Sequence, residues 1–390
     1  MGRGGYGYFA LDITNPNSPS FLFAFQNDAV NKQIYHWDDS GNRTDLGYAV
    51  NIPAEYDYSK LGEAWSTPTI MAMPYGSTRK WVAVFGAGFN GGVNTDYGSA
   101  VYVIDLEDKG KVLKKIDLTD VSNNIANAVP ATLTAITPDT TSKAKYKGAM
   151  FYFADLEGKF WKLNLTDKGT LYEITQFFNA EATQENDRMA FFQVTPSIGN
   201  DGNLWMYYGT GNQQKLQRMS ADIKNRIFGF KDVDFPKFKA VSSSTVAKLK
   251  NNTSTGGICP TSADLGWYVD LDAHEKVTGK LALSNETVFA SRYTPNNNNI
   301  CNPGSSKLTE HNFACGNTLR GTNLGEGIAT GAVIHKGKVY IGISGDGSGD
   351  IKDEQGNIIG SRKDNIIVFT PKSSAKGKGS VTYESWREVF

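Results

Sequence analysis

The chain has 390 residues, of which 39% are hydrophobic and 12% aromatic, so it is long and apolar enough to bury a large core. Lys and Arg together number 40, as do Asp and Glu, and this formal net charge of zero argues against nucleic acid and against an anionic membrane surface as partners. No stretch approaches the roughly 20 apolar residues that span a bilayer, and the 41 glycines favour short strands joined by tight turns.

Strand patterns follow one another along the whole chain. They are short apolar or alternating runs rich in Val, Ile, Tyr, Phe and Trp, bounded by Gly, Asn, Asp or Pro. In chain order they are Tyr8–Ile13, Trp81–Phe85, Ala100–Leu106, Ala149–Phe153, Phe160–Leu165, Leu204–Tyr208, Ile227–Phe230, Val288–Ala290, Val339–Ile343 and Ile366–Phe369. Helical patterns are scarce, and only 212–224 and 243–251 are expected to hold a helical turn or two. The sequence therefore predicts an all-β fold.

A recurring unit organises these strands. It opens with a small residue beside Pro or Gly, as at Ser66-Thr67-Pro68 and Thr195-Pro196. An apolar strand ending in Gly or Asp follows, as at Val82–Gly86, and after a turn comes a strand that closes on Asp or Asn, as at Val101–Asp105. A sheet of three or four such strands cannot bury its own apolar faces, and radial stacking of sheets is how propellers bury them.

The repeat predicts a single β-propeller domain over residues 1–390, with seven irregular blades, or six. The unit spacing is irregular, and the excess length is expected in long polar loop insertions at 27–62, 235–265 and 291–325. The strand at Phe9–Ile13 could pair with the carboxy-terminal strands to close the ring. A pair of β-sandwiches is the alternative architecture, and its linker would lie at 240–257.

Three cysteines, Cys259, Cys301 and Cys315, lie in one Asn/Gly/Ser-rich stretch near residues 250–320. In an exported protein they are interpreted as one loop disulfide, most simply Cys301 with Cys315, and a remaining thiol. A zinc site is disfavoured because no two cysteines are spaced as CxxC. The four histidines, His36, His274, His311 and His335, are expected in loops or at the surface.

One acidic loop is a weak candidate for a calcium site. Its carboxylates are Asp346, Asp350, Asp353 and Glu354. Oxygen-bearing side chains at positions one, three and five resemble the start of an EF-hand loop, but Ile351 replaces the turn glycine and position twelve is not glutamate. The other interpretation is a solvated hairpin loop.

Seven segments, in the same order along the chain, resemble the carboxy-terminal β-propeller of the PilC/PilY type IV pilus tip-adhesin family. They are Gly5–Pro16, Leu61–Pro68, Val84–Asn90 with Val101–Leu106, Ala154–Leu165, Tyr208–Gly211, Gly266–Leu271 and Glu384–Glu388. Each match alone is weak because glycine-bounded strands are common. Seven matches in the same order along the chain argue against coincidence.

The resemblance implies a non-enzymatic protein exported by a Gram-negative bacterium to the pilus tip, the outer cell surface or the periplasm. It implies roles in pilus biogenesis, retraction control and adhesion to host or abiotic surfaces, with minor pilins or other pilus components as partners. The first residues, Met1–Tyr6, do not resemble a signal peptide. The chain is therefore expected to be the carboxy-terminal part of a larger exported protein.

The family often carries a calcium loop before the segment that Ala154–Leu165 resembles. Here Asp139 is the one carboxylate left in the corresponding stretch, and Lys143 stands where another would be expected. A cation would be repelled by that ammonium. The resemblance therefore implies a degenerate loop at Asp139 that does not bind calcium.

The alternative function is that of a propeller enzyme, either a quinoprotein-like dehydrogenase or a glycosidase. The sequence contains no Gly-x-Ser-x-Gly elbow, no Walker loop and no His-Glu-x-x-His motif. A glycosidase would need two inward carboxylates roughly 5–10 Å apart, which a sequence cannot locate. No catalytic residue and no firm cofactor are predicted. A scaffold role in another secretion or uptake machine is a third hypothesis.

Overall fold

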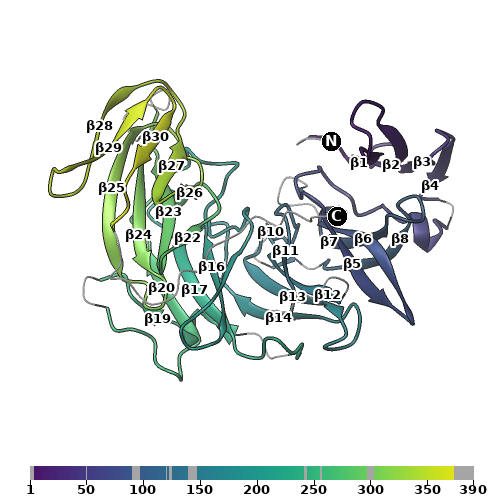
Figure 1. The fold of residues 1–390 in the computed structure, drawn as a ribbon, viewed down its shortest axis with the longest axis horizontal. Coiled ribbons are helices and arrows are strands. Elements are labelled where there is room, and N and C mark those ends of the chain that lie inside the picture. Colours follow the sequence, from purple (N-terminus) through teal and green to yellow (C-terminus); the bar gives the residue numbers. More distant parts are fainter. Residues whose placement is uncertain are drawn as a thin grey trace. The chain divides into compact units, whose positions relative to one another are not determined.

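The computed structural model describes residues 4–49, 51–89, 97–119, 121–122, 125–138, 147–240, 244–254, 257–296 and 303–372. Over these ranges the chain forms sheets that are antiparallel except for two short parallel pairs (Figure 1). Its helical residues are confined to two short 3-10 helices, η1 (Ala54–Tyr56) and η2 (Val246–Lys248). The expected helical turn in 243–251 is η2, whereas 212–224 forms turns without a helix. The all-β prediction is confirmed.

Contacts between residues divide the chain into two compact units. Unit 1 contains Met1–Gln184, Arg188–Val194 and Asp234–Val246. Unit 2 contains Glu185–Asp187, Thr195–Val233 and Ala247–Phe390. The extent of the single predicted domain, 1–390, stays a prediction.

Unit 1 holds three larger sheets and a two-stranded ribbon among its described residues. The first sheet has the order β1 (Gly7–Asp12), β2 (Ser20–Asp28), β3 (Gln33–Trp37), β4 (Arg43–Gly47). The second has the order β5 (Thr69–Tyr75), β6 (Thr78–Gly86), β7 (Ala100–Asp105), β8 (Val112–Asp117). The third has the order β11 (Thr134–Ile136), β12 (Gly148–Ala154), β13 (Lys159–Thr166), β14 (Ile174–Asn179), β18 (Ser244–Thr245). The ribbon is β9 (Val121–Ser122) with β10 (Ile125–Ala126).

Unit 2 also holds three larger sheets within the described ranges. One has the order β15 (Thr195–Ile198), β16 (Leu204–Gly209), β17 (Arg226–Asp232), β20 (Gly266–Asp270), β19 (Lys250–Asn251). In the next, β21 (Lys276–Val277) and β22 (Ala282–Ser284) both pair with β23 (Thr287–Thr294), followed by β24 (Ser305–Asn312) and β25 (Thr318–Glu326). The last has the order β26 (Val333–His335), β27 (Lys338–Gly342), β30 (Ile366–Phe369), β29 (Ile358–Lys363), β28 (Ser348–Lys352).

The sheets match the predicted repeating unit, but the predicted long loops do not all appear. Most of 291–325 consists of β24 and β25 with the end of β23, and 27–62 contains the β3–β4 hairpin. The two insertions therefore contribute strands to the sheets and are not long polar loops. The number of blades, seven or six, stays a prediction.

The core lies between neighbouring sheets because the middle strands are covered on both faces. All seven residues of β12 are buried, as are all six of β7. Between the first and second sheets, Phe25 stacks on Tyr58 with ring centroids 3.9 Å apart, and Phe85 and Tyr102 complete the cluster. Burying each such aromatic side chain contributes about 1.5–3 kcal/mol.

Hydroxyl side chains near the start of four of the sheets bind segments further along the chain. A buried hydroxyl on the opening segment donates a hydrogen bond to a backbone carbonyl of the following sheet or of the segment leading into it. The links are Ser66 to Ala131 at 2.8 Å, Thr134 to Val194 at 2.7 Å, Thr195 to Leu281 at 2.6 Å and Thr278 to Ala329 at 2.6 Å. A hydroxyl at this position therefore has a structural reason, since a buried carbonyl without a donor costs free energy.

Candidate functional site

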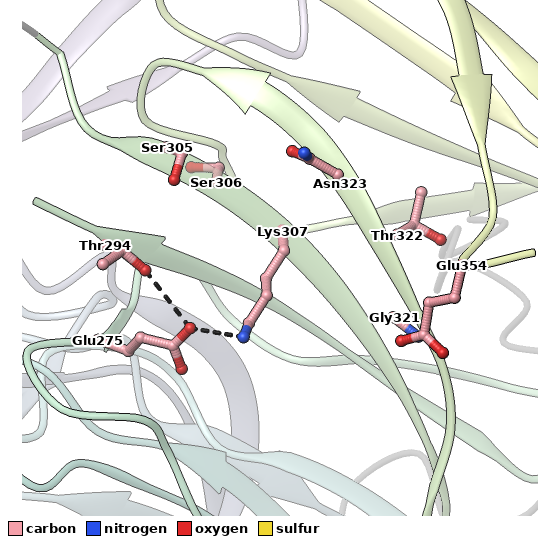
Figure 2. Close-up of a pocket in the computed structure, with 9 residues that line it drawn as sticks. All are labelled: Glu275, Thr294, Ser305, Ser306, Lys307, Gly321, Thr322, Asn323 and Glu354. Carbon is pink, nitrogen blue, oxygen red and sulfur yellow. Dashed lines mark hydrogen bonds and ion pairs between the residues drawn. The ribbon is translucent and has the colours of Figure 1, made fainter. Parts of the chain in front are cut away.

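A pocket of about 340 Å³ opens over the sheet that contains β24 and β25, entirely within unit 2 (Figure 2). Its floor is formed by two neighbouring strands, and its sides come from the loop before β21, the end of β23 and the turn between β28 and β29. The lining residues are Glu275, Thr294, Ser305, Ser306, Lys307, Gly321, Thr322, Asn323 and Glu354. All are polar or glycine, so the pocket is suited to a polar ligand.

Strand register places a second cation beside Lys307, which lies on the pocket floor. Arg292 of β23 lies directly opposite Lys307 of β24, and Lys307 lies opposite Asn323 of β25. Like charges in directly opposite positions destabilise a sheet. The arrangement therefore requires a carboxylate between the two cations.

Glu275 supplies that carboxylate. It is 2% exposed, its Oε1 lies 2.7 Å from Lys307 Nζ, and its Oε2 is paired with the Arg292 guanidinium. The Thr294 hydroxyl donates to Oε1 at 3.4 Å and the backbone N–H of Asp272 donates to Oε2 at 3.1 Å. Both oxygens of Glu275 are thus engaged by the protein. The exposed Asp272 carboxylate also accepts from Lys307 at 3.0 Å.

The opposite wall is Glu354, which points toward Gly321 across the pocket from Lys307 in Figure 2. Its Oε1 accepts a hydrogen bond from the Gly321 N–H at 3.1 Å. A Cβ at position 321 would lie 2.6 Å from that oxygen, so glycine is what allows the carboxylate to sit against the strand. The Glu354 carboxylate is therefore held by a hydrogen bond from a backbone N–H group and not by an ion pair.

The four acidic residues of the proposed calcium loop have separate environments. Asp353 Oδ1 accepts from the backbone N–H groups of Gln355 and Asn357, and Glu354 is held by β25. Asp346 and Asp350 are exposed. Over the described part of the chain, no three His, Cys, Asp or Glu side chains form a group that could hold a metal ion. Calcium at this loop stays a prediction, and Asp139 lies outside the described residues.

The predicted disulfide is wrong in its pairing. Cys315 is bonded to Cys259, 56 residues away in the sequence, and Cys301 lies outside the described residues. The physical reason is the packing of the β24–β25 turn, which contains Cys315, against the chain that leads to Cys259. The Asn252 side-chain amide donates a hydrogen bond to the Cys315 carbonyl, which holds this turn close to residue 259.

Two of the histidines are buried, contrary to the expectation that all four lie in loops or at the surface. His36 is 3% exposed, and its Nε2 lies 2.8 Å from the Lys109 carbonyl oxygen. His311 of β24 is fully buried beside the Trp267 ring. Burial, with a contribution from the charge of Arg292, lowers the pKa of His311 to about 4. This imidazole is therefore neutral in the folded protein at neutral pH.

Two other buried groups, an aspartate and a lysine, have pKa values that are shifted in favour of their neutral forms. Burial raises the pKa of Asp155, in the turn between β12 and β13, to about 7. Its Oδ2 accepts from the Trp161 indole at 2.8 Å. Burial lowers the pKa of Lys276 to about 8, although the nearby Asp187 carboxylate opposes this. Both groups hold turns or loops together, and neither lines the pocket.

The two charges at the centre of the pocket could not be predicted from the sequence. Glu275 and Lys307 are separated by 32 positions and share no motif, so only the fold brings them together. A partial signal existed in β24, where Thr309, Glu310 and His311 are consecutive polar residues that the strand buries. Such residues need buried partners, and Glu310 finds one in Arg320 at 2.8 Å.

No family model matches the chain. A type IV pilus biogenesis factor PilY1 homolog of Xylella fastidiosa (strain Temecula1) is 24% identical over 78% of the chain and 20% of its own length. The type IV pilus biogenesis factor PilY1 of Pseudomonas aeruginosa (strain UCBPP-PA14) is 29% identical over 42% of the chain and 11% of its own length. The chain thus spans at most about a fifth of these two relatives.

A solved structure, the C-terminal domain of Pseudomonas aeruginosa PilY1, superposes with a TM-score of 0.56 at 14% identity. The match covers 94% of this chain and 83% of that domain, and it concerns the fold alone. It confirms the predicted β-propeller class. In the described ranges no helix is long and apolar enough to cross a membrane. The curated homologues are PilY1 and PilY1-like proteins, which confirms the resemblance to the PilC/PilY family.

Proposed function

Since its homologues are PilY1 proteins, we propose that this chain is the β-propeller part of a type IV pilus-associated protein of a Gram-negative bacterium. It acts in pilus biogenesis by binding minor pilins or other pilus components. It contributes to retraction control and to adhesion to host or abiotic surfaces. The protein is exported, and it works at the pilus tip, at the outer cell surface or in the periplasm.

The observation that carries the proposal is similarity to a pilus biogenesis factor along 78% of the chain. The polar lining of the pocket supports a binding role. Each oxygen of Glu275 is already engaged by Lys307, Arg292 or neighbouring donors, so this buried carboxylate has no vacant position for a substrate proton.

The test is deletion of the gene that contains this sequence, followed by complementation. We expect the deletion strain to carry fewer surface pili by electron microscopy and to attach less to epithelial cells and to plastic. The complete wild-type gene should restore both properties. A deletion strain with unchanged pili and unchanged attachment would refute the pilus assignment.

A second complementation tests the pocket itself. A gene carrying Lys307→Ala removes one cation from the pocket, and Lys363→Ala at an exposed position of β29 provides the matched control. If the pocket contacts a partner, the first variant restores export but not attachment, whereas the control restores both. Equal attachment by the two strains would exclude the pocket from the function.

A further inference from the structure

One face of the sheet that contains β23, β24 and β25 is apolar at one end and polar at the other. Ala290 of β23 is buried in the core of unit 2. Because alternate side chains of a strand share a face, Arg292 and Thr294 lie on this same face further along β23. Strand pairing places Lys307 of β24 opposite Arg292. It also places Ser305 opposite Thr294. The polar end of this face is the floor of the pocket.

Glu354 lies over the same face, although it comes from the turn between β28 and β29. Gly321 and Asn323 alternate onto one face of β25, and strand pairing puts Asn323 opposite Lys307. Glu354 Oε1 lies 2.6 Å from the position that a Cβ of residue 321 would take. The Glu354 carboxylate and the Lys307 ammonium therefore face one pocket from the same side of the sheet (Figure 2).

Several polar groups of the pocket have hydrogen-bonding capacity that the described part of the chain does not use. Glu354 Oε2 accepts no hydrogen bond there, and the Ser305 hydroxyl has no partner there. Asn323 Oδ1 accepts from the Gly325 N–H at 2.9 Å, and the amide N–H groups of Asn323 have no acceptor among the described residues. The Lys307 ammonium contacts two carboxylates and so retains one of its three N–H groups.

The charges around the pocket disfavour ionic ligands of either sign. The two cations, Lys307 and Arg292, are balanced by two carboxylates. The Glu354 carboxylate has no ion-pair partner among the described residues, so it repels an anion such as phosphate. An ammonium ligand would meet the Lys307 ammonium and would offer no acceptor to the Asn323 amide. A neutral ligand that carries both donors and acceptors has neither disadvantage.

We propose that the pocket binds a neutral saccharide unit of a host-cell surface glycan. A sugar hydroxyl both donates and accepts hydrogen bonds, so one hydroxyl can donate to Glu354 Oε2 while a neighbouring one accepts from the Asn323 amide. Other hydroxyls of the sugar can reach Ser305 and Lys307. The volume of about 340 Å³ is near the lower end of the roughly 300–1,000 Å³ that is typical of small-molecule sites, which suits a single sugar ring.

The lining of the pocket also sets the expected affinity. No aromatic ring lines the pocket in the described part of the chain, so a bound sugar gains hydrogen bonds without stacking. We therefore expect weak binding of a single sugar, with a Kd of about 1 mM. The inference rests on the proposed function for the place of the glycan, a surface to which the bacterium attaches, whereas the ligand class follows from the pocket itself.

The first test is saturation-transfer NMR with the purified chain and four probes, the methyl glycosides of glucose, galactose, mannose and N-acetylglucosamine. At about 10 mM, roughly ten times the expected Kd, at least one glycoside should receive saturation from the protein. Absence of transfer to all four would refute the proposal. Nα-acetyl-lysine amide represents a cationic peptide ligand, and if it binds in a way that Glu354→Gln abolishes, the pocket belongs to a protein partner and the proposal is wrong.

Three variants locate the binding. Glu354→Gln keeps the size of the side chain but removes its charge, and it should raise the Kd of the bound glycoside about tenfold, because a charged acceptor binds more strongly than a neutral one. Ser305→Leu places an apolar side chain on the pocket floor and should abolish the signal. Glu55→Gln, at an exposed position of η1 in unit 1, is the matched control and should leave the Kd unchanged. Equal transfer to all three variants, each with the melting temperature of the wild type, would overturn the proposal.

Attachment assays identify the source of the glycan. A strain that carries Glu354→Gln should attach less to epithelial cells but should attach to plastic as the wild type does, because plastic carries no host glycan. Reduced attachment to both surfaces would contradict a host-cell ligand. The NMR test uses the purified chain and does not depend on piliation, so its failure is distinct from failure of the proposed function.

Discussion

Substituting single cysteines tests which pair forms the disulfide and how strongly it stabilises unit 2. In a Cys301→Ser background, Cys259→Ser removes the bond to Cys315, while Cys301→Ser alone leaves it intact. The background substitution matters because Cys301 could otherwise pair with Cys315 when Cys259 is absent. The comparison is therefore between the double variant and its own single-variant control.

The expected magnitude follows from the length of chain that the bond closes. A disulfide that joins residues 56 positions apart lowers the entropy of the unfolded chain by an amount equivalent to about 4 kcal/mol at 25 °C. Closure between residues 301 and 315 would contribute about 3 kcal/mol by the same relation. The bond also fixes a turn that packs on the core, since Gly316 lies against the Trp267 ring and its carbonyl lies 3.1 Å from His311 Nδ1. Loss of this packing adds to the effect.

The assay is urea unfolding monitored by tryptophan fluorescence, because Trp267 reports on the region directly. We expect Cys301→Ser to leave the free energy of unfolding unchanged and the double variant to lose up to about 4 kcal/mol. Mass spectrometry of the unreduced, digested wild-type protein should find a peptide pair linked through residues 259 and 315. Destabilisation by Cys301→Ser alone, with a linked pair containing residue 301, would refute the pairing.

Three further predictions concern buried polar groups. The raised pKa of Asp155, from 3.8 to about 7, means that the free energy of unfolding falls by up to about 4 kcal/mol as the pH rises through this window. In urea unfolding, the stability of Asp155→Asn relative to the wild type should therefore increase between pH 4 and pH 7, and a constant difference would contradict this. The lowered pKa of His311, from 6.5 to about 4, has the opposite sign. Stability is lost as pH falls through that window, by up to about 3 kcal/mol, and His311→Gln should flatten this loss in the same assay, whereas an unchanged pH profile would argue against a buried neutral imidazole. Thr134→Val leaves the buried Val194 carbonyl without its donor and should lower the free energy of unfolding by about 1–3 kcal/mol. The control Thr67→Val, at an exposed position, should change it by no more than about 0.5 kcal/mol. Equal effects of the two substitutions would contradict the role assigned to the Thr134 hydroxyl.

The strands with continuous apolar runs could be predicted, and those with buried polar residues could not. β12 and, up to its final Asp105, β7 are apolar because both faces are covered, and their segments stand out in the sequence. The sequence predicts a loop where β24 lies, because Glu310 and His311 interrupt the apolar pattern. In the structure Arg320 neutralises Glu310, and burial keeps His311 neutral. Local hydrophobicity carries no information about such distant partners.

The candidate site could not be predicted from the sequence for a related reason. The sequence predicts Glu354 as a metal ligand in an acidic loop, whereas in the structure it forms a pocket wall and accepts a hydrogen bond from Gly321. Lys307 and Glu275 meet only after β23 and β24 have paired in register. An ion pair between residues so far apart in the chain is a product of topology, which a single sequence without a structure does not specify.

The hydroxyl links between successive sheets have a consequence for shortened versions of the protein. A fragment that stops after β14, at Asn179, would retain Thr134 without its acceptor, the Val194 carbonyl. Fragment boundaries placed a few residues beyond each linking carbonyl avoid this defect. For this chain, boundaries chosen at predicted loops alone would cut through the links that hold consecutive sheets in place.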